Sequence, residues 1–203
     1  MNAQAQLPTA FDVQRVRADF PLLARSVHGK PLVYFDSANT SQKPHSVIEA
    51  VDQHYRLHNA NVSRAVHLLG EEATAAYEGS RDKLARFINA TSRNELILTS
   101  GTTQAMNLIA YSYALPRLKQ GDTILTTVME HHANIVPWHF LRERYGVILK
   151  FVPVTDDGRL DMEAYKGLLS DRTRMVAMSH MSNVLGTIND AAEIVRLAHA
   201  AGA

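Results

Sequence analysis

Residues 96–105 read LILTSGTTQA, an apolar strand-like run that passes through a small, hydroxyl-bearing turn into a helix. In a parallel sheet, ligands bind at the carboxyl ends of the strands. The first turn of a helix also offers unpaired N–H groups and a partial positive charge to an anion. Gly101 allows close approach of the backbone, and Thr102 and Thr103 add hydroxyl donors. The stretch therefore predicts either a phosphate-binding turn or an ordinary N-cap, where Ser and Thr are common.

Around this stretch, from residue 30 onward, apolar runs of strand length alternate with segments of helical period. Such alternation predicts an α/β fold in which helices flank a mostly parallel sheet with right-handed crossovers. The nucleotide-binding patterns G-x-G-x-x-G and G-x-x-x-x-G-K-[ST] are both absent. The predicted strands are residues 32–35, 95–99, 123–128, 147–154 and 174–179. The predicted helices are residues 44–57, 71–88, 102–115, 132–145, 162–169 and 190–201, the last closed by Gly202.

The alternation also predicts the domain organisation. Residues 1–29 lie outside it and indicate an N-terminal arm or a segment of a smaller domain, whereas residues 30–203 form a large domain. The sequence ends one residue after Gly202, where the alternation requires another strand. We therefore expect the large domain to be incomplete and its sheet truncated.

Composition excludes several classes of function. The 203 residues carry a formal net charge of +1, which gives no general attraction to nucleic acid or to an anionic membrane. The chain contains no cysteine, so it supplies no disulfide, thiolate metal site or thiol nucleophile. No signal-peptide pattern begins the sequence, and no apolar run approaches the ~20 residues that span a bilayer. The expected compartment is the cytoplasm.

A pair of histidines follows the predicted strand 123–128, in the stretch 129–134 (MEHHAN). This position is at the same sheet edge as the threonine turn, where a histidine such as His131 can stack on a planar ligand or transfer protons near neutral pH. A zinc site is the weaker alternative, because the pattern H-E-x-x-H is absent and no cysteine is available. Histidines that only cap a helix or form internal hydrogen bonds are a further alternative.

Two more polar loops follow predicted strands. In residues 179–187 (SHMSNVLGT), Asn183 offers a donor and an acceptor to a ligand, although asparagine also serves as a left-handed turn residue. Residues 34–44 (YFDSANTSQKP) lead from a strand to a helix and either border a pocket or simply connect the two. Four polar loops at strand ends indicate one shared ligand site more strongly than any single loop does.

At these loops the sequence resembles the SufS-type, or group II, cysteine desulfurases. These belong to the class V branch of the fold-type I pyridoxal-phosphate enzymes. The most specific match is residues 129–138 (MEHHANIVPW). Matching segments are 16–21 (VRADFP), 36–38 (DSA), 42–44 (QKP), 100–103 (SGTT) and 182–187 (SNVLGT).

The resemblance implies pyridoxal 5′-phosphate as the cofactor and a role for each matching residue. Thr102 and Thr103 match the turn that holds the cofactor phosphate. His131 matches the catalytic histidine that stacks on the pyridine ring and assists proton transfer, and Asn183 matches the asparagine that bonds the phenolic oxygen. Ala38 and Asn39 match the substrate-carboxylate loop. Asn39 replaces the alanine of many relatives, and residues 62–67 (VSRAVH) depart from their usual Val-His-Arg-Gly-Ile-His.

The resemblance further implies conversion of L-cysteine to L-alanine plus a protein-bound persulfide for iron–sulfur cluster assembly, with selenocysteine lyase activity by the same chemistry. It implies a homodimer and a Suf-type sulfur-acceptor protein. Family members use a lysine in a Ser-Gly-His-Lys context and a nucleophilic cysteine. Neither is present here, so we expect the chain alone to be inactive. The alternatives are another class V enzyme, such as an aminotransferase or kynureninase-like hydrolase, and a non-catalytic remnant.

Overall fold

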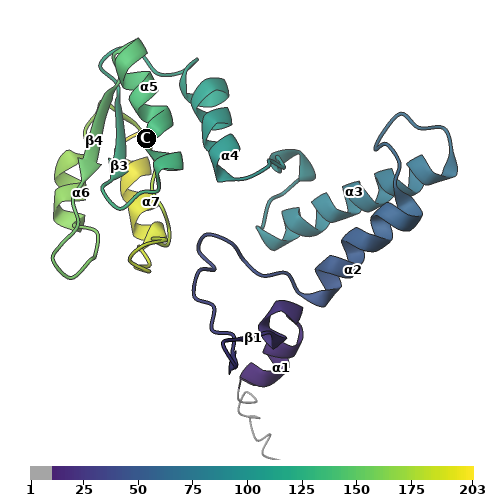
Figure 1. The fold of residues 1–203 in the computed structure, drawn as a ribbon. Coiled ribbons are helices and arrows are strands. Elements are labelled where there is room, and N and C mark those ends of the chain that lie inside the picture. Colours follow the sequence, from purple (N-terminus) through teal and green to yellow (C-terminus); the bar gives the residue numbers. More distant parts are fainter. Residues whose placement is uncertain (1–10) are drawn as a thin grey trace, which may run out of the picture. The chain divides into compact units, whose positions relative to one another are not determined.

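The computed structural model describes residues 11–203, so residues 1–10 of the predicted N-terminal arm lie outside the described residues. The chain divides into two compact units that meet in sequence between Ile97 and Leu98. Figure 1 labels the main helices and strands of both units. The predicted domain boundary between residues 29 and 30 stays a prediction.

The first unit is mainly helical. It begins with α1 (Val13–Ala18), the short 3-10 turn η1 (Pro21–Ala24) and an antiparallel pair of two-residue strands, β1 (Ser26–Val27) and β2 (Lys30–Pro31). The helix predicted at residues 44–57 is present as α2 (His45–Gln53), with Pro44 as its N-cap rather than in its first turn, and it continues into the π-helical turn η2 (His54–His58). The long helix α3 (Leu68–Phe87) and the turn η3 (Arg93–Glu95) complete the unit.

Two predicted strands in this part of the chain were wrong. Residues 32–35 are extended but unpaired, and the side chains of Val33 and Phe35 are 69% and 95% exposed. Of residues 95–99, Glu95 ends η3, and residues 96–99 follow it without strand pairing among the described residues. An apolar run forms a strand only when a neighbouring strand accepts and donates its backbone hydrogen bonds. No such neighbour lies beside either segment in the part of the chain that the structure describes.

The second unit has the predicted parallel α/β architecture. Its sheet has the order β4-β3-β5, and β3 (Thr123–Thr127) pairs in parallel with both β4 (Ile148–Val152) and β5 (Thr173–Val176). The helices between and after these strands are α5 (Val136–Tyr145), α6 (Met162–Leu168) and α7 (Ala191–Ala200). Helix α4 (Thr102–Leu108) precedes the sheet and continues into the π-helical segment η4 (Ile109–Ala114).

Apolar side chains cover the sheet on both faces. On one face, Ile124 of β3 packs with Trp138 and Leu141 of α5 and with the alanines of η4. On the other face, Leu125 packs with Tyr165 of α6 and Ile194 of α7. Because successive residues of a strand point to opposite faces, β3 is buried along its whole length. Both faces of the central strand are therefore covered, and its carboxyl end leads to loops that a ligand can reach.

Helix termini follow the capping signals in the sequence. The carboxylates of Asp161 and Asp190 accept hydrogen bonds from backbone N–H groups in the first turns of α6 and α7, at 2.9 and 3.0 Å. Gly146 after α5 and Gly202 after α7 have positive φ of 67° and 85°, the left-handed conformation that ends a helix. The predicted role of Gly202 is confirmed.

Candidate active site

The loops that leave the carboxyl ends of β3 and β5 are joined by the buried side chain of Glu130. Its carboxylate accepts hydrogen bonds from the Ser179 N–H at 2.8 Å and from the Ser179 hydroxyl at 2.6 Å. It also accepts from the Thr127 hydroxyl at 2.7 Å and from Nδ2 of Asn134 at 2.8 Å. These bonds hold the segment that carries His131 against the segment that leads to Asn183.

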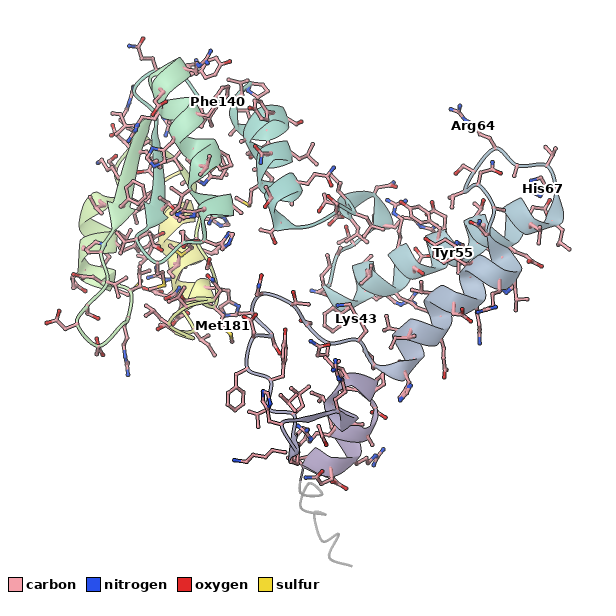
Figure 2. All side chains as sticks on the ribbon, in the orientation of Figure 1. Lys43, Tyr55, Arg64, His67, Phe140 and Met181 are labelled. Atoms are coloured by element: carbon pink, nitrogen blue, oxygen red, sulfur yellow. The ribbon has the colours of Figure 1, made fainter. Side chains whose placement is uncertain are left out.

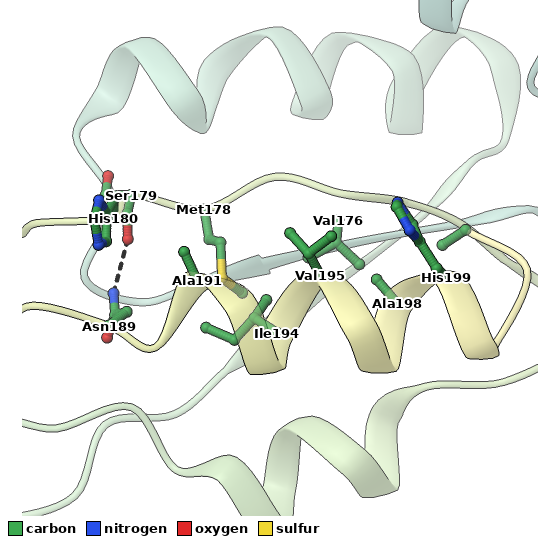
Figure 3. A pocket seen from close by; sticks show the side chains of 11 residues that line it. Val176, Met178, Ser179, His180, Asn189, Ala191, Ile194, Val195, Ala198 and His199 are labelled. Carbon is green, nitrogen blue, oxygen red and sulfur yellow. Dashed lines mark hydrogen bonds between the residues drawn. The ribbon is translucent and has the colours of Figure 1, made fainter. Parts of the chain in front are cut away.

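Asn189 closes the second of these loops. Its Nδ2 donates to the carbonyl of Ser179 at 2.7 Å, and its backbone N–H donates to the carbonyl of His180 at 2.8 Å. Figure 3 shows Asn189 bonded to Ser179 near the start of α7. An antiparallel bridge between Met181, which Figure 2 labels, and Ile188 narrows the loop further. The loop 179–189 is therefore fixed at its base and exposes its tip.

His131 is the N-cap of the 3-10 turn η5 (His132–Asn134), and its ring is exposed. Nδ1 of His131 accepts a hydrogen bond from the Ala133 N–H at 3.1 Å. In a neutral ring this leaves Nε2 as the protonated nitrogen, directed away from the turn. The capping alternative is confirmed for His131, whose ring stays exposed, and its role toward a ligand stays a prediction.

Helix α4 contacts η5, the turn that follows His131. Gly101 is the N-cap, with φ 148° and ψ 177°, and no side chain caps the helix. Gln104 instead accepts from the N–H and hydroxyl of Ser100. Among the described residues, the N–H and hydroxyl groups of Thr102 and Thr103 have no acceptor. Neither threonine is the N-cap of the helix, so a threonine cap is excluded, and phosphate binding at this turn stays a prediction.

Asn183 lies at the exposed tip of the loop 179–189. Below it, the hydroxyl of Ser182 accepts from the N–H groups of Val184 and Leu185 at 3.3 and 3.1 Å. Asn183 does not have positive φ, whereas Gly186 has φ 71°. The alternative of a left-handed turn residue is therefore wrong for Asn183. Its side chain has no hydrogen-bond partner in residues 11–203 and is free to bind a ligand.

A second loop supports the Asn183 loop from the side. The hydroxyl of Thr187 donates to the carbonyl of Gly158 at 2.6 Å, in the turn between β4 and α6. In that turn the Thr155 hydroxyl beside Asp157 lowers the pKa of the Asp157 carboxyl. Gly158 has φ 77°, so the turn needs a residue without a side chain at that position. The turn at residues 156–158 therefore contacts the loop 179–189.

Ala38 and Asn39 belong to the first unit, in an exposed loop. The Tyr34 hydroxyl donates to the carbonyl of Thr40 at 2.6 Å, which closes the loop. Lys43, labelled in Figure 2, donates from Nζ to the carbonyl of Ser41 at 2.7 Å. Asn39 N–H donates to the carbonyl of Asp36 at 3.2 Å. The substrate-binding roles of Ala38 and Asn39 stay predictions.

A pocket of about 320 Å³ lies at the carboxyl ends of the strands. Its wall includes residues directly before His131 and on both sides of Asn183. The lining residues are Val128, Met129, Glu130, Val154, Ser182, Val184 and Leu185. A second pocket, of about 270 Å³, lies between β5 and α7 (Figure 3) and is mostly apolar. It contains none of the predicted site residues.

The family model for "Aminotransferase class-V" matches residues 33–203. The chain belongs to this family. Class V membership agrees with the parallel sheet and with a ligand site at its carboxyl edge. Within residues 11–203, no group of three or more His, Cys, Asp or Glu side chains is arranged to hold a metal ion. No helix in that range is long and apolar enough to cross a membrane.

Class V relatives of this chain include named desulfurases. A probable cysteine desulfurase of Xylella fastidiosa (strain 9a5c) is 54% identical over 202 residues, which are 100% of this chain and 48% of that protein. The Escherichia coli cysteine desulfurase CsdA superposes with a TM-score of 0.81 at 38% identity, covering 95% of this chain and 47% of that one. The apo cysteine desulfurase of Thermococcus onnurineus NA1 gives 0.85 at 36% identity, covering 100% and 47%. The chain spans about half the length of these relatives.

Glu130 is the residue of this candidate site that sequence reasoning missed. It stands directly before the two histidines, but nothing in the sequence links it to Ser179, which lies 49 positions later. The only signal is a charged residue in a strand end that is otherwise apolar or neutral. A carboxylate is rarely buried without a purpose, because transfer from water is costly unless hydrogen bonds compensate it.

Proposed function

We propose that this chain is part of a pyridoxal-phosphate-dependent cysteine desulfurase of the SufS type. The observation that carries the proposal is the junction at Glu130. It holds the His131 loop and the Asn183 loop together at the carboxyl end of a parallel sheet, and α4, which begins with Thr102 and Thr103, contacts η5 in the same unit. Family membership and the desulfurase names of the relatives support the same activity.

The residues present fit pyridoxal 5′-phosphate. A phosphate group needs several hydrogen-bond donors and no nearby carboxylate, and Thr102 and Thr103 each offer an N–H and a hydroxyl without an internal acceptor. The exposed ring of His131 suits stacking on a planar heterocycle, and Asn183 can donate from Nδ2 to a phenolic oxygen. When bound, the cofactor supplies an electron sink for chemistry at the carbon next to an amino group.

The chain's own residues then hold the cofactor, orient it and transfer a proton. Thr102 and Thr103 fix the phosphate end, and Asn183 fixes the opposite edge of the ring. His131 carries its exchangeable proton at Nε2, because Nδ1 is bonded to the Ala133 N–H. Nε2 is therefore the atom that transfers a proton in the reaction we propose. The loop at Ala38 and Asn39 binds the substrate carboxylate, with the Ala38 N–H as a backbone donor, because the Asn39 N–H already bonds the carbonyl of Asp36.

The substrate of the whole protein is L-cysteine, and L-selenocysteine reacts by the same chemistry. The products are L-alanine and a persulfide on a cysteine, from which sulfur passes to a Suf-type acceptor protein for iron–sulfur cluster assembly. We propose a cytoplasmic homodimer with neither nucleic acid nor membrane as partner. The 203-residue chain by itself releases no sulfide, because it has no cysteine and none of its six lysines stands in a Ser-Gly-His-Lys context.

The test is cofactor binding by the purified chain. Pyridoxal phosphate is titrated while its absorbance is recorded, and inorganic phosphate is then added as a competitor. We expect saturable binding that the double variant Thr102→Ala, Thr103→Ala weakens by about 10- to 100-fold, since a hydrogen bond to a charged group contributes about 1.5–3 kcal/mol. Thr91→Ala, an exposed threonine in the first unit, is the matched control. Equal binding by wild type and double variant contradicts the assignment.

A second measurement addresses the activity of the chain. The purified chain is incubated with pyridoxal phosphate and L-cysteine, and sulfide and alanine are quantified. We expect neither product above the level of free cofactor. Sulfide release that depends on the chain would show that another group replaces the lysine and the cysteine.

A further inference from the structure

Glu130 is unusual because it is a buried carboxylate with no cation beside it. The residue is 8% exposed. No Lys or Arg of residues 11–203 lies within ion-pair distance of it, although other carboxylates of the chain have such partners, as Glu163 has in Lys166. All the stabilisation that the structure gives Glu130 comes from hydrogen-bond donors on two different loops. Such an arrangement is costly for stability alone, since an apolar pair would fill the same space more favourably.

The donors are held in fixed directions. The Ser179 N–H belongs to the backbone, and the hydroxyl of Thr127 already accepts from the Met129 N–H at 3.2 Å, so its own proton points to Glu130. Oδ1 of Asn134 accepts from Nε1 of Trp138 at 3.1 Å, so Nδ2 faces Glu130. The carboxylate is therefore the required acceptor at this point, and a neutral amide is not equivalent to it.

The network extends from the core to the loop tips. Trp138 is fully buried among the side chains of α5 and β3, and it anchors Asn134, which anchors Glu130. Ser179 carries the connection into the loop 179–189, whose base Asn189 closes by bonding the carbonyl of Ser179. His131 directly follows Glu130 in sequence, and Asn183 is at the tip of the connected loop.

We propose that Glu130 is a positioning residue that sets the spacing between His131 and Asn183. At this spacing His131 stacks on the face of the cofactor ring, and Asn183 bonds the phenolic oxygen at the edge of the same ring. This inference rests on the proposed function. Glu130 touches neither cofactor nor substrate in it and acts only through the two loops. Loss of the Glu130 carboxylate therefore both loosens the loop 179–189 and weakens cofactor binding.

Two variants test the inference at different strengths. Glu130→Gln keeps the shape of the side chain but places an NH₂ group opposite a fixed hydrogen-bond donor. That donor is either the Ser179 N–H or Nδ2 of Asn134, and its hydrogen bond is lost. Ser179→Ala is milder, because it removes the 2.6 Å hydroxyl bond and keeps the backbone bond. Glu163→Gln is the matched control, because the Glu163 side chain is 85% exposed and bonds only to Lys166 among the described residues.

The first readout is hydrogen exchange of the purified chain without cofactor. We expect Glu130→Gln to raise exchange in residues 179–189 by about tenfold or more, and Ser179→Ala to raise it less. Exchange in α6 of both variants should stay at the wild-type level. The control Glu163→Gln should exchange like wild type in residues 179–189. The emission of Trp138, the single tryptophan, should also change in Glu130→Gln, because its partner Asn134 loses an acceptor. Unchanged exchange in residues 179–189 in both variants overturns the inference.

The second readout is the dissociation constant and absorption maximum of bound pyridoxal phosphate. We expect the dissociation constant to rise about tenfold in Glu130→Gln, with a shifted absorption maximum, because Asn183 no longer meets the phenolic oxygen in the same geometry. Faster exchange with unchanged affinity and spectrum means that Glu130 is only a structural tie, which overturns the positioning role. If wild type binds no pyridoxal phosphate, the proposed function itself fails, whatever the exchange data show.

Discussion

Ser179 binds both carboxylate oxygens of Glu130, its N–H at 2.8 Å and its hydroxyl at 2.6 Å, across 49 positions of sequence. The two residues follow neighbouring parallel strands, β3 and β5, so their contact lies at the carboxyl edge of the sheet. These two hydrogen bonds therefore fix the position of the loop after β3 relative to the loop after β5. The strands alone fix only where the loops begin.

The support beneath Glu130 yields a first prediction, for Asn134→Ala. The substitution removes the 2.8 Å bond to Glu130 and leaves the indole N–H of Trp138 buried without an acceptor. We expect the free energy of unfolding of the second unit to fall by about 1–3 kcal/mol, the cost of an unsatisfied buried group. Urea unfolding followed by circular dichroism and Trp138 emission measures it. Asn94→Ala, at an exposed position, is the control, and an equal effect of both variants contradicts the network.

Tyr165 gives a prediction for alkaline pH. Burial raises the pKa of Tyr165 to about 12, and its hydroxyl donates to the carbonyl of Ile194 at 2.9 Å. Because the folded pKa lies above the ordinary value of about 10, the contribution to stability is complete below pH 10 and is lost as the pH rises through 12. The folded state has to keep the proton that the unfolded state releases.

The test compares wild type with Tyr165→Phe between pH 8 and pH 11 (~3 pH units, spanning the ordinary tyrosine pKa). Below pH 10 the variant should be less stable by about 1 kcal/mol, the net value of one buried hydrogen bond. Above pH 10 the difference should shrink, since only wild type has the hydroxyl that must stay protonated. The other six of the seven tyrosines are present in both proteins, so the comparison isolates Tyr165. A stability difference that is constant with pH contradicts the assignment.

The sequence predicted the helices and the parallel sheet of the second unit because their signals are local. Caps such as Asp161 and Asp190 and the left-handed Gly202 mark helix ends independently of the rest of the fold. The strands at residues 32–35 and 95–99 were wrong because strand formation depends on a neighbour that local sequence does not specify. Apolar content alone made these segments look like strands.

The candidate site also contains residues that local sequence points to and one residue whose role depends on a distant partner. Thr102, Thr103, His131 and Asn183 could be predicted because each follows a recognisable strand or begins a helix. Glu130 could not be assigned a role, since its function depends on Ser179, and only the register of β3 with β5 brings the two together. Whether Asn183 was a left-handed turn residue also depended on the loop, where Gly186 takes that conformation instead.

A core substitution tests whether the α5 face of the sheet is packed as described. Leu141 is fully buried against Ile124 and Trp138. Leu141→Ala should lower the free energy of unfolding by about 2–5 kcal/mol, because it removes apolar contacts and leaves a cavity. Leu185→Ala, at a side chain that is 51% exposed, should change it by less than about 1 kcal/mol. Equal losses for the two variants in urea unfolding would mean that the face is not closed as the structure shows.

Two glycines give opposite expectations for the same substitution. Gly101, with φ 148° and ψ 177°, has a conformation that is essentially restricted to glycine, so Gly101→Ala should destabilise its unit by about 1–3 kcal/mol. Gly79 lies inside α3, with no atom within 4 Å of an added Cβ, so Gly79→Ala should stabilise its unit by about 0.5–1 kcal/mol. The strain at Gly101 also moves the Thr102 and Thr103 donors. Pyridoxal phosphate affinity should therefore fall in Gly101→Ala alone, and an unchanged affinity would remove the phosphate from this turn.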